Sequence, residues 1–493
     1  MRDKHIVIIG AGPGGLTAGM LLAHRGFKVS IFEKDNIVGG RNKSISIGPY
    51  KFDLGPTFLM MKYILDDIFS SVGKKLEDYV TTIRLDPMYR LSFSDFYIDI
   101  TDDHEIMCER LNEKFPDSSN GFKKFLKVEK IRFDHIKRCF EKPYCSLLDM
   151  LGREFITSIP YLALGRSVND VLTDYYRDEK LRFCFCFQSK YLGMSPWECP
   201  GAFAMIPYVE HEFGIYHVIG GLSEISSAMA RVIKDFGGEI YSGCKVSKIL
   251  CENSEVKGVV LDSGDKVKAD VVVINADFGY AMSNLFEKGI LKKYSRETLE
   301  KKKYSCSTFM LYLGLDKVYD EPHHNIFFAN DYRKNAEEVT VKKVLSEDFS
   351  FYVRNASVTD PTIAPKGHSA LYVLVPVPNN TSNIDWDKIK IEYRDRLVEN
   401  IKKRTSMKDI DSHIREEFYI TPLDWERMGI FKGATFNLAH NLSQMLYFRP
   451  HNRFEELENC YLVGGGTHPG SGLPTIYESG MISSSLIMRK LGG

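Results

Sequence analysis

The sequence predicts an α/β protein with a Rossmann-like parallel-sheet domain into which a mixed α+β domain is inserted. The first observation is "HIVIIGAGPGG" at residues 5–15, where an apolar β-branched run leads into a glycine-rich turn. The second is that buried-strand patterns return far along the chain, in "ADVVVINAD" (269–277) and "CYLVG" (460–464). The third is the length of 493 residues, which is too long for one ordinary core and predicts more than one domain.

Composition and charge exclude several classes of protein. Lys+Arg and Asp+Glu both number 65, and this balance argues against a dedicated nucleic-acid binder, so no nucleic-acid partner is expected. The ten cysteines form neither a C-x-x-C pair nor a zinc pattern, so we predict no metal site and a reducing, cytoplasmic compartment. Residues 1–5 lead directly into a strand rather than a signal peptide, and no run of about 18 apolar residues predicts a membrane span. Attachment to a membrane surface remains open.

The first glycine cluster has the features of a dinucleotide-binding turn. Gly10 permits the tight turn, Gly12 allows a pyrophosphate to approach the backbone, and Gly15 lets the following helix pack on the strand. The second strand, "KVSIFE", ends at Glu33, where a carboxylate can hold ribose hydroxyls. Since strand, helix, second strand and acid are all in place, we favour dinucleotide binding over an ordinary tight βα turn.

A second local pattern bears on which dinucleotide is bound. "EKDNIVGGR" places Gly39, Gly40 and Arg41 directly after the acid, and an arginine offers a fixed fork of donors to phosphate oxygens. The alternative for Arg41 is a solvated loop cation. The pattern resembles the extended fingerprint of flavin oxidoreductases of the amine oxidase type, and this resemblance implies FAD. "FDLGPT", with Gly55 and Thr57, continues it.

The middle of the chain is rich in helix formers and aromatic residues. Residues 121–144 are basic and contain spaced phenylalanines, which predicts an amphipathic surface helix of a second domain. The alternative is a patch that faces anionic lipid. Residues 181–218 are markedly apolar and belong either to the core or to the lining of a long apolar cavity.

The α/β pattern returns near residue 215. A helix from Leu222 to the Gly237–Gly238 pair is followed by the strands "EIYSG", "VSKIL" and "VKGVVL". We therefore predict a discontinuous cofactor domain of residues 1–70, 215–280 and 455–493. Residues 71–214 and 281–454, with the strands "STFMLYLGLD" and "SALYVLVPVP", form the predicted substrate-binding and membrane-docking domain.

From end to end the chain resembles the bacterial-type phytoene desaturase family of carotenoid biosynthesis. The resemblance rests on "FDLGPTFLMM", "KYSCSTFMLYLGLD", "VTDPTIAPKG", "YFRPHNR" and "GGGTHPGSGLP", and the first two stretches look closest to dehydrosqualene (diapophytoene) desaturases. It implies an FAD-binding domain of the amine oxidase (GR2) type, an inserted substrate domain and a helical, membrane-facing part. It also implies that hydrogen is removed from a long apolar polyene at a membrane surface, with an electron acceptor such as quinone or oxygen. The alternatives are a carotenoid oxygenase or ketolase, an isomerase or a saturase, and more remotely a non-enzymatic lipid-binding escort protein.

The resemblance also implies roles for individual residues. Val246 would lie near the adenine, and Gly465, Gly466 and Pro474 near the ribityl and flavin end, with Gly465 standing where many flavin oxidases have an acid. Asp149 in "CSLLDMLG" would be the catalytic carboxylate beside an allylic cation. The alternative for Asp149 is a helix residue that faces water. His468 is expected to be a turn residue rather than a proton carrier.

Overall fold

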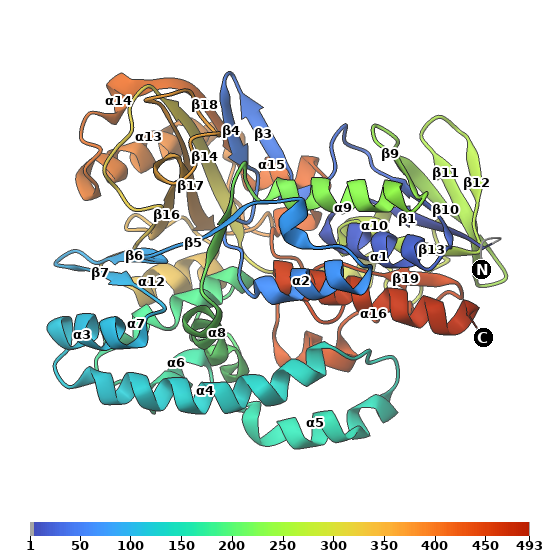
Figure 1. The fold of residues 1–493 in the computed structure, drawn as a ribbon, viewed down its shortest axis with the longest axis horizontal. Coiled ribbons are helices and arrows are strands. Elements are labelled where there is room, and N and C mark those ends of the chain that lie inside the picture. Colours follow the sequence, from blue (N-terminus) through green and yellow to red (C-terminus); the bar gives the residue numbers. More distant parts are fainter. Residues whose placement is uncertain (1–3, 493) are drawn as a thin grey trace.

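The computed structural model describes residues 4–492. A five-stranded parallel sheet lies at the end of the molecule where both chain termini are found (Figure 1). All neighbouring strands in it are parallel, so their carboxyl ends share one edge. In spatial order the strands are β19 (Cys460–Leu462), β13 (Val271–Ile274), β1 (His5–Ile9), β2 (Lys28–Phe32) and β9 (Glu239–Tyr241).

The two faces of this sheet are covered differently. Helices pack on one face, where Ile6, Ile8 and Ile31 share a buried cluster with helix residues. These helices are α1 (Pro13–His24), α2 (Lys62–Ser71), α9 (Ser223–Asp235) and α16 (Leu473–Leu491). The other face packs on a three-stranded antiparallel sheet and on α10. These elements are β10 (Val246–Glu252), β11 (Glu255–Leu261), β12 (Lys266–Lys268) and α10 (Phe278–Asn284). Because both faces are covered, the central strands β1 and β13 are almost entirely apolar and buried.

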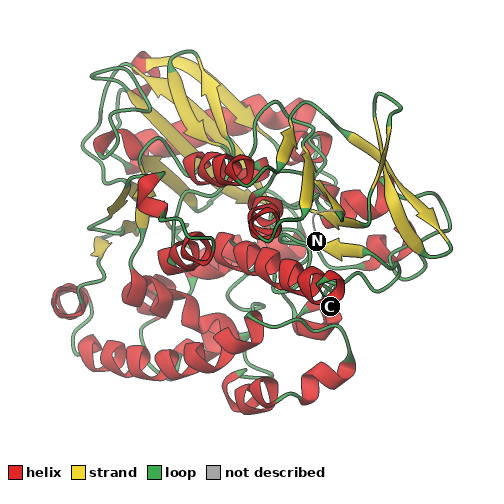
Figure 2. Ribbon diagram, turned by 45° about the vertical axis from the view of Figure 1, so that its right-hand side comes forward, coloured by secondary structure: helices red, strands yellow, loops and turns green. Residues whose placement is uncertain are grey.

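A second, seven-stranded sheet lies beside the first (Figures 1 and 2). Its strand order is β18 (Ile414–Ile420), β14 (Ser307–Leu315), β17 (Ser369–Val377), β16 (Phe351–Asn355), β15 (His324–Phe327), β6 (Tyr89–Ser92) and β7 (Tyr97–Ile100). The helix α13 (Trp386–Arg404) packs against it through Trp386 and Tyr393. The hairpin of β3 (Ser44–Ile47) and β4 (Tyr50–Asp53) packs on this second sheet, because Tyr50 and Phe52 share a cluster with Met310 and Tyr312.

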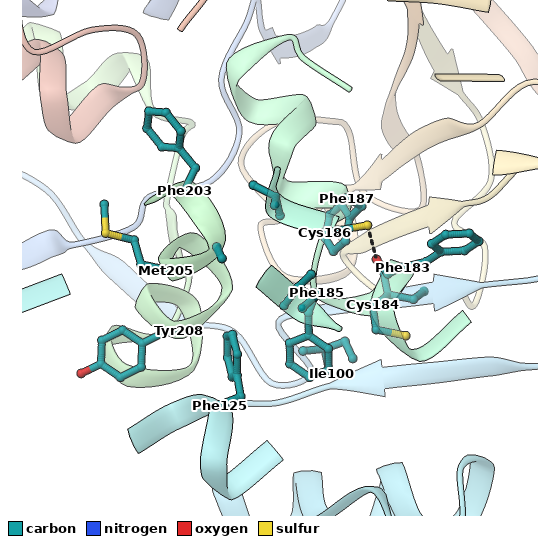
Figure 3. Close-up of a cluster of buried hydrophobic side chains, with 14 of the residues drawn as sticks. Ile100, Phe125, Phe183, Cys184, Phe185, Cys186, Phe187, Phe203, Met205 and Tyr208 are labelled. Carbon is teal, nitrogen blue, oxygen red and sulfur yellow. Dashed lines mark hydrogen bonds between the residues drawn. The ribbon is translucent and has the colours of Figure 1, made fainter. Parts of the chain in front are cut away.

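Helices from the middle of the chain complete the molecule on the side opposite the sheets (Figure 1). They enclose an aromatic cluster that includes Phe125, Phe183, Phe185 and Tyr208 (Figure 3). The helices are α3 (His104–Lys114), α4 (Ser118–Phe140), α5 (Arg153–Ser158), α6 (Val168–Leu172), α7 (Glu179–Cys184) and α8 (Ile206–Phe213). Short 3-10 turns join them at η3 (Leu147–Leu151), η4 (Ile159–Tyr161), η5 (Phe187–Leu192) and η6 (Gly201–Met205).

The remaining elements are short connections. The strands are β5 (Thr82–Arg84) and β8 (Tyr216–Val218), which pair with each other. The helices are α11 (Arg296–Lys301), α12 (Tyr332–Glu337), α14 (Ile410–His413) and α15 (Pro422–Arg427). The single turns are η1 (Gly40–Asn42), η2 (Leu76–Asp78), η7 (Glu338–Lys342), η8 (Ala356–Val358), η9 (Phe431–Gly433), η10 (Leu442–Gln444) and η11 (Leu446–Phe448).

The α/β fold and the predicted strands are confirmed, and so is the helix expected over residues 121–144, which is α4. The phenylalanines Phe122, Phe125 and Phe133 of α4 are buried and do not face lipid, whereas the alternative that the basic side of this helix faces anionic lipid stays a prediction. Their helical spacing puts them on the inner face together with the buried ion pair of Glu129 and Arg132, while most of the other charged residues face out. All strands of the parallel sheet lie within residues 1–70, 215–280 and 455–493, although the hairpin 44–53 packs on the second sheet. The domain division itself stays a prediction.

Candidate functional site

The turn after β1 lies at the carboxyl edge of the parallel sheet and begins the candidate site. Gly10 has a φ of +96°, a backbone conformation that side chains rarely adopt, and its N–H donates to the Phe32 carbonyl at 2.8 Å. A Cβ on Gly15 would collide with the Gly10 carbonyl oxygen, so α1 can start this close to the turn only with glycine there. Gly12 is the N-cap of α1, and the first turn of this helix presents free N–H groups.

The C-terminal glycine segment lies directly against this turn. A Cβ on Gly14 would lie 3.1 Å from the Gly464 nitrogen. Asn275, at the end of β13, lies between them and donates from Nδ2 to the Gly10 carbonyl at 3.0 Å. Helix α16 then packs on α1, where a Cβ on Gly480 would lie 2.7 Å from the Cβ of Thr17. The two glycine clusters, far apart in sequence, therefore form one surface.

The loop at residues 39–41 covers the turn from another side. A Cβ on Gly40 would lie 3.3 Å from the Gly12 Cα. Arg41 donates to the Thr435 carbonyl at 2.8 Å, and its guanidinium lies 3.8 Å from the carboxylate of Asp277. Burial raises the pKa of the Asp277 carboxyl. Arg41 is thus held by interactions at the sheet edge and is not a free loop cation.

Gly55 lies beside the loop at residues 39–41, and Val246 lies beside the ends of β1 and β2. A Cβ on Gly55 would lie 2.6 Å from the Arg41 carbonyl oxygen, so this backbone passes directly beside the loop. Val246 is buried at the start of β10 in one apolar cluster with Phe32 and Ile9.

Glu33 follows β2 at the same sheet edge and is 4% exposed. Its carboxylate oxygens accept from the Ala11 N–H at 2.7 Å and from the Asp35 N–H at 2.9 Å. Burial raises the pKa of the Glu33 carboxyl. The acid therefore lies next to the glycine turn, as the sequence predicts.

Arg449 supports the C-terminal glycine segment and was not predicted from the sequence. It is fully buried, and its guanidinium donates to the carbonyls of Leu438, Gln444, Gly465 and Thr467. Burial lowers the pKa of the guanidinium to about 9. A Cβ on Gly465 would lie 2.7 Å from the Ser471 Oγ, so an acid at this position would displace Ser471.

Comparisons with known proteins agree with this geometry. The family described as flavin containing amine oxidoreductase matches residues 13–488. The chain belongs to this family. A 4,4'-diapophytoene desaturase (4,4'-diapolycopene-forming) from Methylomonas sp is 53% identical over 490 residues, which cover 99% of this chain and 96% of the relative. An all-trans-zeta-carotene desaturase from Myxococcus xanthus is 37% identical, with 99% and 94% covered.

A solved structure gives the same fold. An oxidoreductase from Methanosarcina mazei superposes with a TM-score of 0.64 at 19% identity and covers 98% of this chain and 99% of its own. At this identity the likeness shows the fold alone. The resemblance to the carotenoid desaturase branch of the flavin amine oxidoreductases, and FAD as the cofactor, are confirmed by the family and these relatives.

The described residues fit the flavin cofactor of the amine oxidoreductase family. Beyond the glycine turn, Thr435 Oγ1 and Asn437 Oδ1 are buried without a hydrogen-bond partner. A Cβ on Gly466 would lie 2.9 Å from that Asn437 oxygen, and Pro474 stands in the first turn of α16. Unpaired polar atoms beside a bare glycine backbone are what a polar cofactor would satisfy. The sequence did not indicate Thr435 or Asn437, because neither lies in a recognisable motif.

Two further predicted residues, Asp149 and His468, differ in burial. Asp149 is exposed on η3, where its carboxylate accepts from the N–H groups of Cys145 and Ser146 at 2.7 Å each. This matches the alternative of a water-facing helix residue, and its catalytic role stays a prediction. His468 is fully buried, packs edge-on against Tyr144 at 5.1 Å, and neither ring nitrogen has a hydrogen-bond partner.

Thr57 connects the glycine surface to the interior of the second sheet. Its hydroxyl shares a hydrogen bond with the Tyr352 hydroxyl at 2.9 Å, and Tyr352 in turn bonds the His324 Nδ1 at 2.7 Å. Burial and the neighbouring Arg354 lower the pKa of His324 well below its usual range, so the ring is neutral. These interior groups were also missed by motif reasoning.

Proposed function

We propose that the chain is an FAD-dependent desaturase that introduces C=C bonds into a long polyene hydrocarbon. The observation that carries the proposal is the end-to-end identity of 53% with a diapophytoene desaturase, on a chain whose glycine turn, Glu33 and Arg41 lie together. For the same reason the preferred substrate is 4,4'-diapophytoene. In this proposal the adenosine and pyrophosphate end of FAD is held by Gly10, Gly12, Gly15, Glu33 and Val246. The remainder of the cofactor lies along Gly40, Arg41, Gly55, Thr57, Gly465, Gly466 and Pro474.

The chain's part in the reaction is to bind a molecule without polar groups and to exclude water. FAD supplies the acceptor for a hydride from an allylic carbon. The polyene can be held only by burial of hydrocarbon, at about 25 cal/mol per Å². The aromatic cluster around Phe125, Phe185 and Tyr208 is fully buried, so it forms the apolar core behind such a site in the predicted substrate domain (Figure 3).

The purified protein tests this proposal with C30 and C40 polyenes supplied side by side in liposomes. We expect bound flavin, and a red-shifted product from 4,4'-diapophytoene that has lost two hydrogens for each new double bond. A product that has gained oxygen would identify an oxygenase or ketolase, and an unchanged mass an isomerase. A protein that binds no flavin and leaves both polyenes unchanged would contradict the proposal.

We further propose that an exposed aliphatic patch docks on a membrane, where such a substrate is dissolved. The patch lies on η3, α5 and the residues that follow, and α5 is at the lower edge of Figure 1. Its most exposed members are Leu148 at 74% and Leu151 at 67%. The full patch is Leu147, Leu148, Leu151, Ile156, Ile159 and Leu164. Exposed apolar side chains gathered in one segment mark an interaction surface. No helix among residues 4–492 is long and apolar enough to span a bilayer.

The double change Leu148→Glu with Leu151→Glu is expected to weaken liposome binding by roughly 10²–10⁴-fold, because each buried leucine contributes about 1.5–3 kcal/mol. Flavin content and thermal stability should not change, since both side chains are exposed. Co-sedimentation with liposomes measures the effect. Ile391→Glu is the matched control, because Ile391 is 54% exposed on α13. Unchanged sedimentation of the double variant would exclude the patch.

A further inference from the structure

A buried carboxyl group in the helical part of the molecule has no role in the cofactor site described above. Glu210 lies on α8 and is fully buried. Its Oε2 accepts from the Tyr89 hydroxyl at 2.8 Å and from the Gln188 amide at 2.9 Å. Its Oε1 accepts from the Tyr191 hydroxyl at 2.9 Å. It is costly to bury a carboxyl group in an apolar core, and the three side-chain donors offset part of this cost. A buried group that is supported in this way calls for an explanation.

One of these donors also belongs to a group of aromatic rings that stay partly accessible. We call Phe58, Tyr191 and Tyr352 the aromatic wall. The Phe58 ring contacts Tyr191 edge-on at 5.6 Å and Tyr352 at 5.8 Å, between ring centres. All three rings pack against the buried aromatic cluster, yet each keeps accessible surface, whereas Glu210 and Tyr89 behind them keep none. Of the three donors to Glu210, Tyr191 alone keeps accessible surface, so it is the donor that connects the carboxyl group to the wall.

The aromatic wall adjoins the cofactor site through a short piece of backbone. Gly55 lies against the Arg41 carbonyl, and three residues later Phe58 is part of the wall. Between them Thr57 is hydrogen-bonded to Tyr352. The Gly55 carbonyl also accepts from the Tyr372 hydroxyl at 2.7 Å, which fixes this segment. The chain thus passes from the cofactor side to the wall within four residues.

Desaturation needs a proton acceptor as well as a hydride acceptor. We propose, resting on the proposed function, that the reacting segment of the polyene lies against the aromatic wall and that Glu210 receives its proton through Tyr191. The C–H bond that loses the proton leaves its electron pair as the new π bond. The proton joins the Tyr191 oxygen while the hydroxyl proton of Tyr191 passes to the Glu210 carboxylate. The hydride leaves the neighbouring carbon for the flavin oxidant of the proposed function, so two hydrogens and two electrons are accounted for.

The surroundings of Glu210 suit this role. Burial raises the pKa of Glu210 to about 7, while the donors Gln188, Tyr89 and Tyr191 oppose the rise. A base that titrates near neutral pH is well matched to proton transfer. The groups that face the carboxyl are Tyr89 on β6 and Gln188 and Tyr191 on η5, and none of them carries a charge at neutral pH. The rate should therefore rise with pH through about 7 as the carboxylate forms.

The test measures flavin reduction by a polyene in single turnovers without oxygen, across pH. Tyr191→Phe removes only the hydroxyl and should lower the rate at high pH by about 10²–10⁴-fold. Tyr89→Phe removes a donor on the far side of the carboxylate, so it should move the rise to higher pH and keep the upper rate. Glu210→Gln should remove the rise. Tyr332→Phe is the matched control, because that buried hydroxyl has no hydrogen-bond partner.

A second measurement needs no turnover. Infrared difference spectra between wild-type protein and Glu210→Gln should show the carbonyl band of a protonated carboxyl that disappears through about pH 7. The difference isolates Glu210 from Glu478, whose burial raises its pKa to about 8. A wild-type protein that reduces no flavin contradicts the proposed function and this inference with it. An active wild type whose upper rate survives Tyr191→Phe, or whose pH rise survives Glu210→Gln, contradicts this inference alone.

Discussion

The Gly12→Val variant is expected to lose bound FAD. A Cβ at this position would lie 2.9 Å from the Asn275 Nδ2, so a valine would force Asn275 to move and would cover the backbone that a pyrophosphate approaches. Loss of two charge-assisted hydrogen bonds at roughly 1.5–3 kcal/mol each predicts a fall in affinity of about 10²–10⁴-fold. Flavin absorbance after purification, and titration of the stripped protein with FAD, measure it.

Arg25→Val is the matched control for this change, because Arg25 is exposed directly after the same helix α1. It introduces the same side chain without touching the turn, so it should retain flavin. Normal flavin content in Gly12→Val would contradict the assignment of this turn to the pyrophosphate.

The Arg449→Met variant is expected to lose both stability and flavin. The change leaves the carbonyls of Leu438, Gln444, Gly465 and Thr467 without their buried donor. Unsatisfied buried groups cost about 1–3 kcal/mol each, and because some of them will find water we expect a total loss of roughly 3–5 kcal/mol. The Gly465 segment should then move away from the cofactor. Urea unfolding with and without FAD measures the loss.

Arg453→Met is the control for the loss of charge, because Arg453 is exposed four residues further along the chain. Its stability should remain close to that of the wild type. If both variants unfold at the same urea concentration, the guanidinium of Arg449 does not hold the glycine segment.

The fold was largely predictable, because its signals are local. β-branched runs such as Ile6–Ile9 and the glycines at 10, 12 and 15 encode strand and turn over a few residues. The same holds for α4, where helical spacing placed the phenylalanines on one face. The local pattern does not show what the apolar face of α4 packs against. In the structure this face packs against the protein core.

The candidate site was predictable only where a motif marks it. Arg449 and Glu210 act through burial among distant residues, and a single charged residue in a sequence gives no sign of burial. The run "LLDML" shows the opposite case, since its leucines lie exposed. Asp149 in that run was chosen by resemblance, and the structure places its carboxylate at the surface.

The contact between Gly14 and Gly464 has a consequence for biosynthesis. Gly14 is synthesised long before its neighbours β19 and α16, because residues 15–459 come between them in the sequence. During translation the nascent chain exposes an incomplete nucleotide pocket and one open edge of the parallel sheet at β13. A cofactor can therefore contact both glycine clusters only after residues 460–491 have been synthesised.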